Sequence, residues 1–450
     1  MTEQPYHFDN LYTPLLVCYS FFIVFLLLKI VKGDSLFSPG FFFLVAWTTL
    51  LNFTIFIEKI GGLYKPITQI SVYYIIKYVV WSGFGLLIAN IVPVPSINQK
   101  KYSFHLYDPK LHSFIYYYNK YSKILFVFFL ILSMSLLINK IVSTRTFSLS
   151  WFYSIRLDYL ERKSNTFDWF LTHISNILLG VLIVSAAADA ITENKFDIKK
   201  IVLFTLVTAP LGLSKGGRGY LFSGLIHYSI TYLSCIKPKM MKKYIKTNIS
   251  ILLFIPIVLV ILSFVFASFG ELRESTSGKF YIDVMAWISA TVAALDSWIS
   301  MAATYGRTNG GCIFNWFFVK LHSVGLTSTH STFPFILCSQ ELALASDTAW
   351  SIPPSMIPGI LFDFGKSFFG LIAFTITFVF EYTSRIFSQS VLIHSVIRSF
   401  LSITLFWTIQ QIYLFGSSSI VLIFWPILLI LILPSKPKTF LHPIYQQKLK

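Results

Sequence analysis

The sequence predicts an all-α, polytopic integral membrane protein, on the evidence of its composition and of its recurring apolar runs. Of its 450 residues, 55% are hydrophobic and only 12% are charged. This composition is too apolar for a soluble globular domain, and it is typical of a chain that crosses a bilayer repeatedly. We therefore expect about eleven membrane-spanning helices of roughly twenty residues each, arranged in one membrane domain over residues 1–450.

The positions of the charges predict how these helices are oriented. The net charge is +17, and loops retained in the cytoplasm of a membrane protein are enriched in Lys and Arg. The strongest such loop, residues 237–243, carries four lysines. The first ten residues hold Glu3 and Asp9 but no Lys or Arg. The N-terminus is therefore predicted to lie outside, the basic C-terminal tail is predicted to lie inside, and the first apolar run should be a retained helix.

The expected helices can be taken in chain order. The apolar runs are residues 11–31, 37–57, 70–92, 124–142, 167–188, 201–213, 221–233, 249–269, 356–380, 391–413 and 418–433. Residues 93–123 contain five lysines and read as an inside loop. Residues 143–166 have two interpretations. They form either a solvated surface helix with offset charge pairs, or a segment that brings Arg156 toward an outer cavity.

A long outside region is predicted over residues 270–354. Long connections of this kind are often functional, and this one contains His330, Glu341 and Asp347. Within it, residues 281–303 are apolar enough to cross a membrane, but Asp283 and Asp296 interrupt the run. An in-plane or partly re-entrant helix is favoured over a crossing, because a crossing would invert every later assignment.

The stretch expected to carry chemistry is Ser214-Lys215-Gly216-Gly217-Arg218-Gly219-Tyr220, between two apolar runs. Its glycines allow backbone amides to approach a ligand closely. Its arginine offers a planar, permanently charged group suited to phosphate oxygens. The stretch is either a seat for a lipid-linked phosphate or diphosphate, or a tight connecting turn with a positive flank. Lys215, Gly217, Arg218 and Gly219 are the candidate binding residues.

One further cation lies within an apolar run. Arg398 is well inside residues 391–413, and His394 lies one turn earlier on the same helical face. A buried arginine of a membrane helix usually faces a cavity or a charged partner. Arg398 is therefore predicted either to help bind a lipid phosphate or to pair with an acidic side chain elsewhere. His227, within another run, and Asp363, before a helix, are expected to be a core residue and a helix cap respectively.

The absence of several catalytic motifs from the sequence excludes some classes of enzyme. The outside segments contain no closely spaced acidic pair of the kind that metal-dependent glycosyl transfer uses. The sequence also has no nucleophile elbow, nucleotide-phosphate loop or dinucleotide fingerprint. We therefore expect no metal, no cofactor and no nucleic-acid partner. Separated arginines suit a donor whose leaving group is already a diphosphate, with Arg218 and Arg273 stabilising that group and His330, Glu341 or Asp347 acting as the base.

The order of these features resembles the O-antigen and oligosaccharide repeat-unit polymerase (Wzy-type) family. The likeness rests on three features between residues 147 and 416. They are the glycine-rich turn with Arg218, the segment 269–274 with Arg273 after the next outward helix, and a long outer loop that ends in prolines and a glycine-containing helix start at 351–370. In the family, an arginine often lies near the outer end of the penultimate helix, where this chain has Gln410 and Gln411.

The resemblance implies a membrane glycosyltransferase of GT-C type in the bacterial inner membrane. It would transfer a growing glycan from undecaprenyl diphosphate to a new lipid-linked repeat unit at the periplasmic face, with membrane lipid around it and a chain-length-regulating co-polymerase as a partner. The N-terminus would then be periplasmic and the C-terminus cytoplasmic.

Two alternatives remain open at this point. An O-antigen ligase would share the outer arginines and the large outer loop. A polysaccharide flippase or other transporter would instead be expected to have more helices, central charges in several of them, and short loops.

Overall fold

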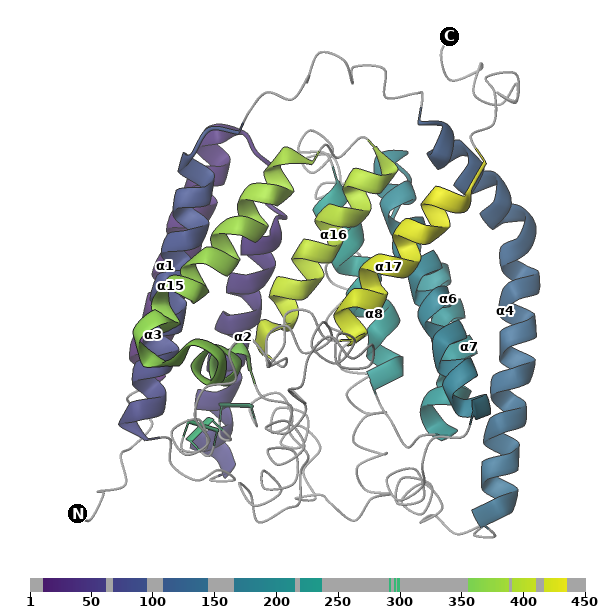
Figure 1. The fold of residues 1–450 in the computed structure, drawn as a ribbon, viewed down its shortest axis with the longest axis horizontal. Coiled ribbons are helices and arrows are strands. Elements are labelled where there is room, and N and C mark those ends of the chain that lie inside the picture. The colour runs from purple at the N-terminus through teal and green to yellow at the C-terminus, as the bar shows by residue number, and fades with distance from the viewer. Residues whose placement is uncertain are drawn as a thin grey trace, which may run out of the picture. The chain divides into compact units, whose positions relative to one another are not determined.

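The computed structural model describes residues 11–61, 68–94, 108–144, 166–214, 219–236, 355–387, 391–409 and 417–434, with short pieces at 291–292, 295–296 and 298–299. Within these residues every regular element is a helix (Figure 1). Seven described helices are long and apolar enough to cross a membrane. The chain is therefore an all-α, multi-pass membrane protein, as its composition predicts.

The helix boundaries follow the predicted runs with two exceptions. The helices are α1 Tyr12–Lys32, α2 Pro39–Gly61, α3 Gln69–Ile91, α4 Pro109–Thr144, α6 Thr166–Ile191, α7 Ile198–Ser214, α8 Gly219–Cys235, α15 Met356–Ile386, α16 Leu392–Phe406 with the 3₁₀ turn η4 Trp407–Ile409, and α17 Ser417–Ile432. The predicted run 249–269 and most of the predicted outer region lie outside the described residues.

The first exception is α4, because its first fifteen residues were predicted to belong to a loop and are helical. The helix begins at Pro109 and runs for 36 residues. Its start is set by Asp108, whose Oδ1 accepts the backbone N–H of Lys110 at 3.0 Å. An Asp cap followed by Pro at the first helical position is a strong start signal. The run at 124–142 marks only the most apolar part of this helix.

The second exception is α15, which was expected to be one uninterrupted crossing from residue 356. At Gly365 the backbone has φ 69° and ψ −177°, which breaks the helix. Residues 356–363 are buried, and a helix from 356 to 364 is only about 13 Å long, too short to cross a bilayer. The crossing itself is therefore residues 366–386. Gly365 lies within the glycine-containing stretch 351–370 on which the family likeness partly rests.

The chain divides into two compact units. The first comprises Met1–Val94, Pro238–Ile386 and Phe400–Val421. The second comprises Pro95–Lys237, Phe387–Ser399 and Leu422–Lys450.

In the first unit, α3 and α15 form the closest helix pair, and α1 and α2 pack beside them (Figure 1). Gly85 of α3 makes this approach possible, because a Cβ placed there would lie 2.5 Å from the backbone oxygen of Phe374. Gly370 of α15 likewise lies against the indole ring of Trp81. Small residues at helix contacts let backbones approach closely, which is how membrane helices gain packing energy.

Cationic side chains from neighbouring helices cap the end of α3. The last carbonyl groups of a helix have no partner within the helix, and α3 ends at Val92 without a glycine cap. Arg385 of α15 donates to the oxygens of Ala89 and, at 3.0 Å, Val92. Lys32 of α1 donates to the oxygen of Asn90. Three helices are thus joined at one end of this unit by charge-assisted hydrogen bonds.

At the other end of α3, Asp296 caps the helix. Its Oδ2 accepts the backbone N–H of Thr68 at 3.0 Å, and its Oδ1 accepts the hydroxyl of Thr68 at 2.6 Å. The described residues around Asp296 are helical, and Trp298 packs edge-to-face against Phe362 of α15. The interrupted segment 281–303 therefore contributes a helical piece at the end of α3 that the sequence predicts to be outer. Whether it crosses, as opposed to lying in-plane, stays a prediction.

In the second unit, α7 packs against α4 and α8, and α6 packs against α8. Gly224 of α8 lies so close to Phe204 of α7 that an added Cβ would meet that ring at 2.6 Å. Asp108 serves two helices here, because its Oδ2 also accepts the backbone N–H of Leu392 at 2.8 Å, at the start of α16. Lys110 caps the end of α17 by donating to Leu431 O at 3.1 Å and to Leu433 O.

Candidate functional site

The glycine-rich turn lies between two helices that pack against each other. Helix α7 ends at Ser214 and α8 begins at Gly219, so only Lys215–Arg218 connect them. Gly219 is thus the first helical residue, directly after the predicted arginine. The first backbone N–H groups of a helix have no partner within it and point toward the preceding turn. The helices on both sides of the turn are where the sequence predicts them.

Most of the other predicted site residues fall outside the described part of the chain. These are Arg156, Lys215, Gly217, Arg218, Arg273, His330, Glu341 and Asp347. Their convergence in an outer cavity, and the assignment of a base among His330, Glu341 and Asp347, therefore stay predictions.

Arg398 is buried in the second unit, with 6% of its surface exposed. The adjacent Ser399 hydroxyl lies 3.3 Å from the thiol of Cys235, which ends α8, and that thiol also donates to the oxygen of Ser395 at 3.4 Å. Gly219 is at the opposite end of this 17-residue helix, about 25 Å away. The neighbourhood of Arg398 is therefore the Cys235 end of α8, far from the glycine-rich turn.

His227 is buried in α8, as expected of a core residue. Its exposed fraction is 5%, and its Nδ1 lies 2.7 Å from the backbone oxygen of Ser223, one turn earlier. Asp363 is also buried, with 2% exposed, two residues before the break at Gly365. Asp363 therefore lies just before the part of α15 that crosses the membrane, which is the position predicted for a helix cap.

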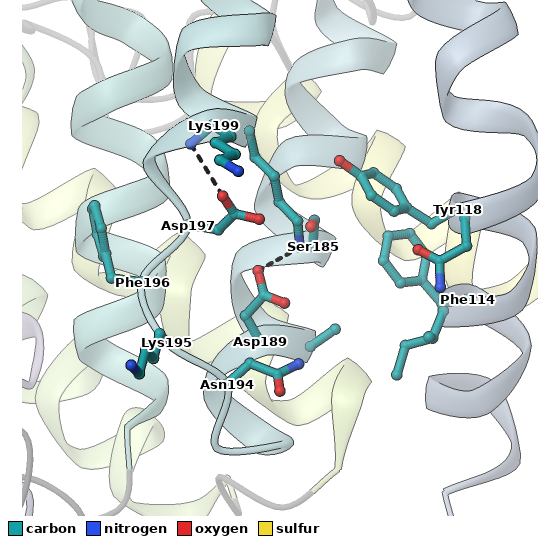
Figure 2. Close-up of a pocket in the computed structure, with 13 residues that line it drawn as sticks. Phe114, Tyr118, Ser185, Asp189, Asn194, Lys195, Phe196, Asp197 and Lys199 are labelled. Atoms are coloured by element: carbon teal, nitrogen blue, oxygen red, sulfur yellow. Dashed lines mark hydrogen bonds and ion pairs between the residues drawn. The ribbon is translucent and has the colours of Figure 1, made fainter. Parts of the chain in front are cut away.

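A polar cavity of about 490 Å³ lies in the second unit, at the end of α7 opposite the glycine-rich turn. Its walls come from α4, from the end of α6, from the connection 192–197 and from the start of α7. Figure 2 shows Phe114 and Tyr118 of α4 on one side, facing Asp189, Asn194 and Asp197 on the other. From the sequence, residues 189–200 were predicted only as the connection between the runs 167–188 and 201–213, and this cavity was not predicted.

A hydrogen-bonded ion pair forms the inner wall of the cavity. The Lys200 ammonium group donates to Asp189 Oδ2 at 2.6 Å, and the Tyr228 hydroxyl donates to the same oxygen at 2.7 Å. The ammonium group also lies 5.2 Å from the centre of the Tyr118 ring. The Asp189 carboxylate of α6 therefore has partners on two other helices, α7 and α8. Buried charge in a membrane helix needs partners of this kind.

The rim of the cavity is more open and carries further polar groups. Asn119, Asn194, Lys195 and Lys199 are all exposed. Asp197 caps α7, with its Oδ1 accepting the backbone N–H of Lys199 at 3.0 Å, as Figure 2 shows. The rim thus presents amide and ammonium donors at the entrance to a polar cavity.

No family model, curated protein or solved structure matches the chain. Functional assignment therefore rests on the residues themselves. Among the described residues, no group of three or more His, Cys, Asp or Glu side chains is placed to hold a metal ion.

One feature of the sequence could have revealed the cavity, namely charged residues at the facing ends of two successive apolar runs. Asp189 closes an apolar run of small residues, and Lys199 and Lys200 open the next run only ten residues later. Two charged helix ends joined by a short connection must lie together, because the connection cannot separate them by much. Tyr118 and Tyr228 could not have been added from spacing, since they come from distant parts of the chain.

Proposed function

We propose that this protein polymerises undecaprenyl-diphosphate-linked oligosaccharide repeat units of O-antigen or a related surface polysaccharide. The growing glycan would be transferred from its lipid diphosphate to a new lipid-linked unit at the periplasmic face of the bacterial inner membrane. The proposed architecture has about eleven crossings, a GT-C type arrangement and a periplasmic region over residues 270–354. A chain-length-regulating co-polymerase would act as a partner.

The observation that carries the proposal is the cationic glycine-rich turn between α7 and α8. Lys215 and Arg218 lie in a connection of four residues, and α8 begins immediately after Arg218. A helix N-terminus favours negative charge, and glycines let backbone amides approach a phosphate oxygen. Together with the guanidinium group of Arg218, this turn suits the diphosphate of a polyprenyl carrier.

The chemistry requires stabilisation of the leaving diphosphate and activation of the acceptor. As the glycosidic bond breaks, negative charge develops on the diphosphate, and Arg218 with Arg273 would neutralise it. A carboxylate or imidazole from the outer region, His330 or Asp347, would remove the proton of the attacking sugar hydroxyl. Lys215, Gly217 and Gly219 would contribute to binding, and Arg156 would approach the same outer cavity.

The test is genetic complementation followed by gel analysis of lipopolysaccharide. Arg218→Ala and Arg273→Ala should each abolish or strongly reduce the long-chain ladder while the protein remains in the membrane. Arg218→Lys should restore only part of it, because lysine cannot form a two-pronged contact with a phosphate. Lys123→Ala, which changes an exposed lysine of α4 on the predicted cytoplasmic side, is the control and should leave the ladder intact. Normal ladders from both site variants would refute the assignment.

A deletion strain separates the polymerase from its nearest rival. A polymerase deletion should retain lipid A core carrying a single repeat unit. Loss of all repeat units from lipid A core would indicate a ligase and overturn the proposal.

A further inference from the structure

The polar cavity in the second unit has an excess of cationic groups at its rim. Five charged residues line the cavity, and they are Lys195, Lys199 and Lys200 against Asp189 and Asp197, so the lining carries one positive charge in excess. Within the described residues, neither Lys195 nor Lys199 forms an ion pair. The rim therefore favours a negatively charged ligand.

An exposed and mostly apolar stripe on α7 begins at this rim. Lys199, Val202, Leu203 and Leu206 lie three or four residues apart and so share one face of α7. All four are exposed, with 49% of Val202 and 62% of Leu206 accessible. In a helix that crosses a bilayer, such a face contacts acyl chains. A ligand at the rim can therefore extend down the stripe only if its remainder is apolar.

Neighbouring α4 also exposes apolar side chains. It packs against α7 and exposes Ile124, Phe128 and Ile131, with accessible fractions of 68%, 54% and 60%. Asn119 lies on the same helix at the level of the cavity. Polar donors thus lie above and apolar side chains below, along two packed helices.

We propose that this cavity binds the phosphate group of an anionic membrane lipid. Lys199 and Lys195 would donate to the phosphate oxygens, and the amides of Asn119 and Asn194 would contact headgroup hydroxyl or ester oxygens. The acyl chains would lie along α7 and α4. By the predicted topology, this is the cytoplasmic end of the helices, so the lipid would belong to the inner leaflet.

Charge and shape together select this ligand class. A zwitterionic lipid carries a compensating ammonium group that the rim lysines would repel. A soluble phosphate would gain the same ionic contacts but nothing from the exposed apolar stripe. An anionic lipid is therefore the ligand that would contact both the cationic rim and the apolar stripe.

Native mass spectrometry of the full-length protein in detergent tests the inference. The protein is titrated with dioleoylphosphatidylglycerol, with dioleoylphosphatidylcholine, and separately with inorganic phosphate. We expect phosphatidylglycerol to be retained preferentially, and the double variant Lys195→Gln/Lys199→Gln to bind it about tenfold less tightly. Lys123→Gln, an exposed lysine of α4 that does not line the cavity, is the matched control and should retain normal binding.

Equal retention of the two lipids, or unchanged binding by the double variant, would overturn the inference. Competition by millimolar inorganic phosphate that fully displaces the lipid would also overturn it, because the apolar stripe would then contribute nothing. Both lysines are exposed, so the variant should fold, and its elution profile and circular dichroism check this. The readout is independent of polymer synthesis, so its failure would leave the proposed function untouched.

Discussion

Lys29 and Glu381 form an ion pair at 2.7 Å, although their side chains are only 2% and 0% exposed. The second carboxylate oxygen accepts the backbone N–H of Gly40 at 2.9 Å. The pair joins α1 to α15 and to the start of α2, across 352 positions of sequence. Because each charge would be costly to bury alone, the pair ties the assembly of these three helices to a specific register.

Removing one member of this pair should be far more destabilising than removing both. Glu381→Leu leaves an uncompensated ammonium group and should lower the free energy of unfolding by about 3–5 kcal/mol. The double variant Lys29→Met/Glu381→Leu should recover most of that loss. Thermal or denaturant unfolding in detergent measures both. Additive losses in the double variant would show that the two residues act independently.

A second prediction concerns the shared cap at Asp108. Its two oxygens cap α4 and α16, at 3.0 Å from Lys110 N and 2.8 Å from Leu392 N. Asp108→Ala should therefore lose two caps, at about 1 kcal/mol each. Asp197→Ala, which removes the cap of α7 alone, serves as the comparison and should cost about half as much. Equal losses in unfolding experiments would contradict the double role of Asp108.

A third prediction separates backbone contact from side-chain contact within α3. A Cβ at Gly85 would meet the backbone of α15, whereas a Cβ at Gly83 would meet the ring of Phe21. Gly85→Ala should force the helices apart and cost about 1–3 kcal/mol. Gly83→Ala should cost less, because a phenyl ring can rotate away. Melting temperatures in detergent would rank the two variants, and the reverse order would refute the proposed packing.

A fourth prediction concerns the break in α15. Gly33 has φ 67° and ψ 19°, a conformation that asparagine tolerates, whereas Gly365 has φ 69° and ψ −177°. The latter region is essentially restricted to glycine, and a side chain there costs about 1–3 kcal/mol. Gly365→Asn should therefore lower the melting temperature clearly, while Gly33→Asn should be nearly neutral. Two similar melting curves would argue against the break.

The local sequence was sufficient to predict a helix where the length and hydrophobicity of one segment alone decide whether that helix forms. The apolar runs at 11–31, 37–57 and 70–92 became α1, α2 and α3 within a few residues, because length and hydrophobicity alone decide whether a segment is a membrane helix. The short connection from Ser214 to Gly219 was equally readable from its glycines. Runs of uniform hydrophobicity were misleading where a polar cap or one glycine set the boundary, as at Asp108 and Gly365.

By itself, the sequence determined that this chain is a multi-pass helical membrane protein and where most of its described helices lie. Only the tertiary structure decided which charges meet, including Lys29 with Glu381, Lys200 with Asp189, and Asp296 with Thr68. The reason is physical. Periodicity reports which residues share a face of one helix, but the partner of a buried charge is chosen by how several helices pack, and that information is spread over distant parts of the chain.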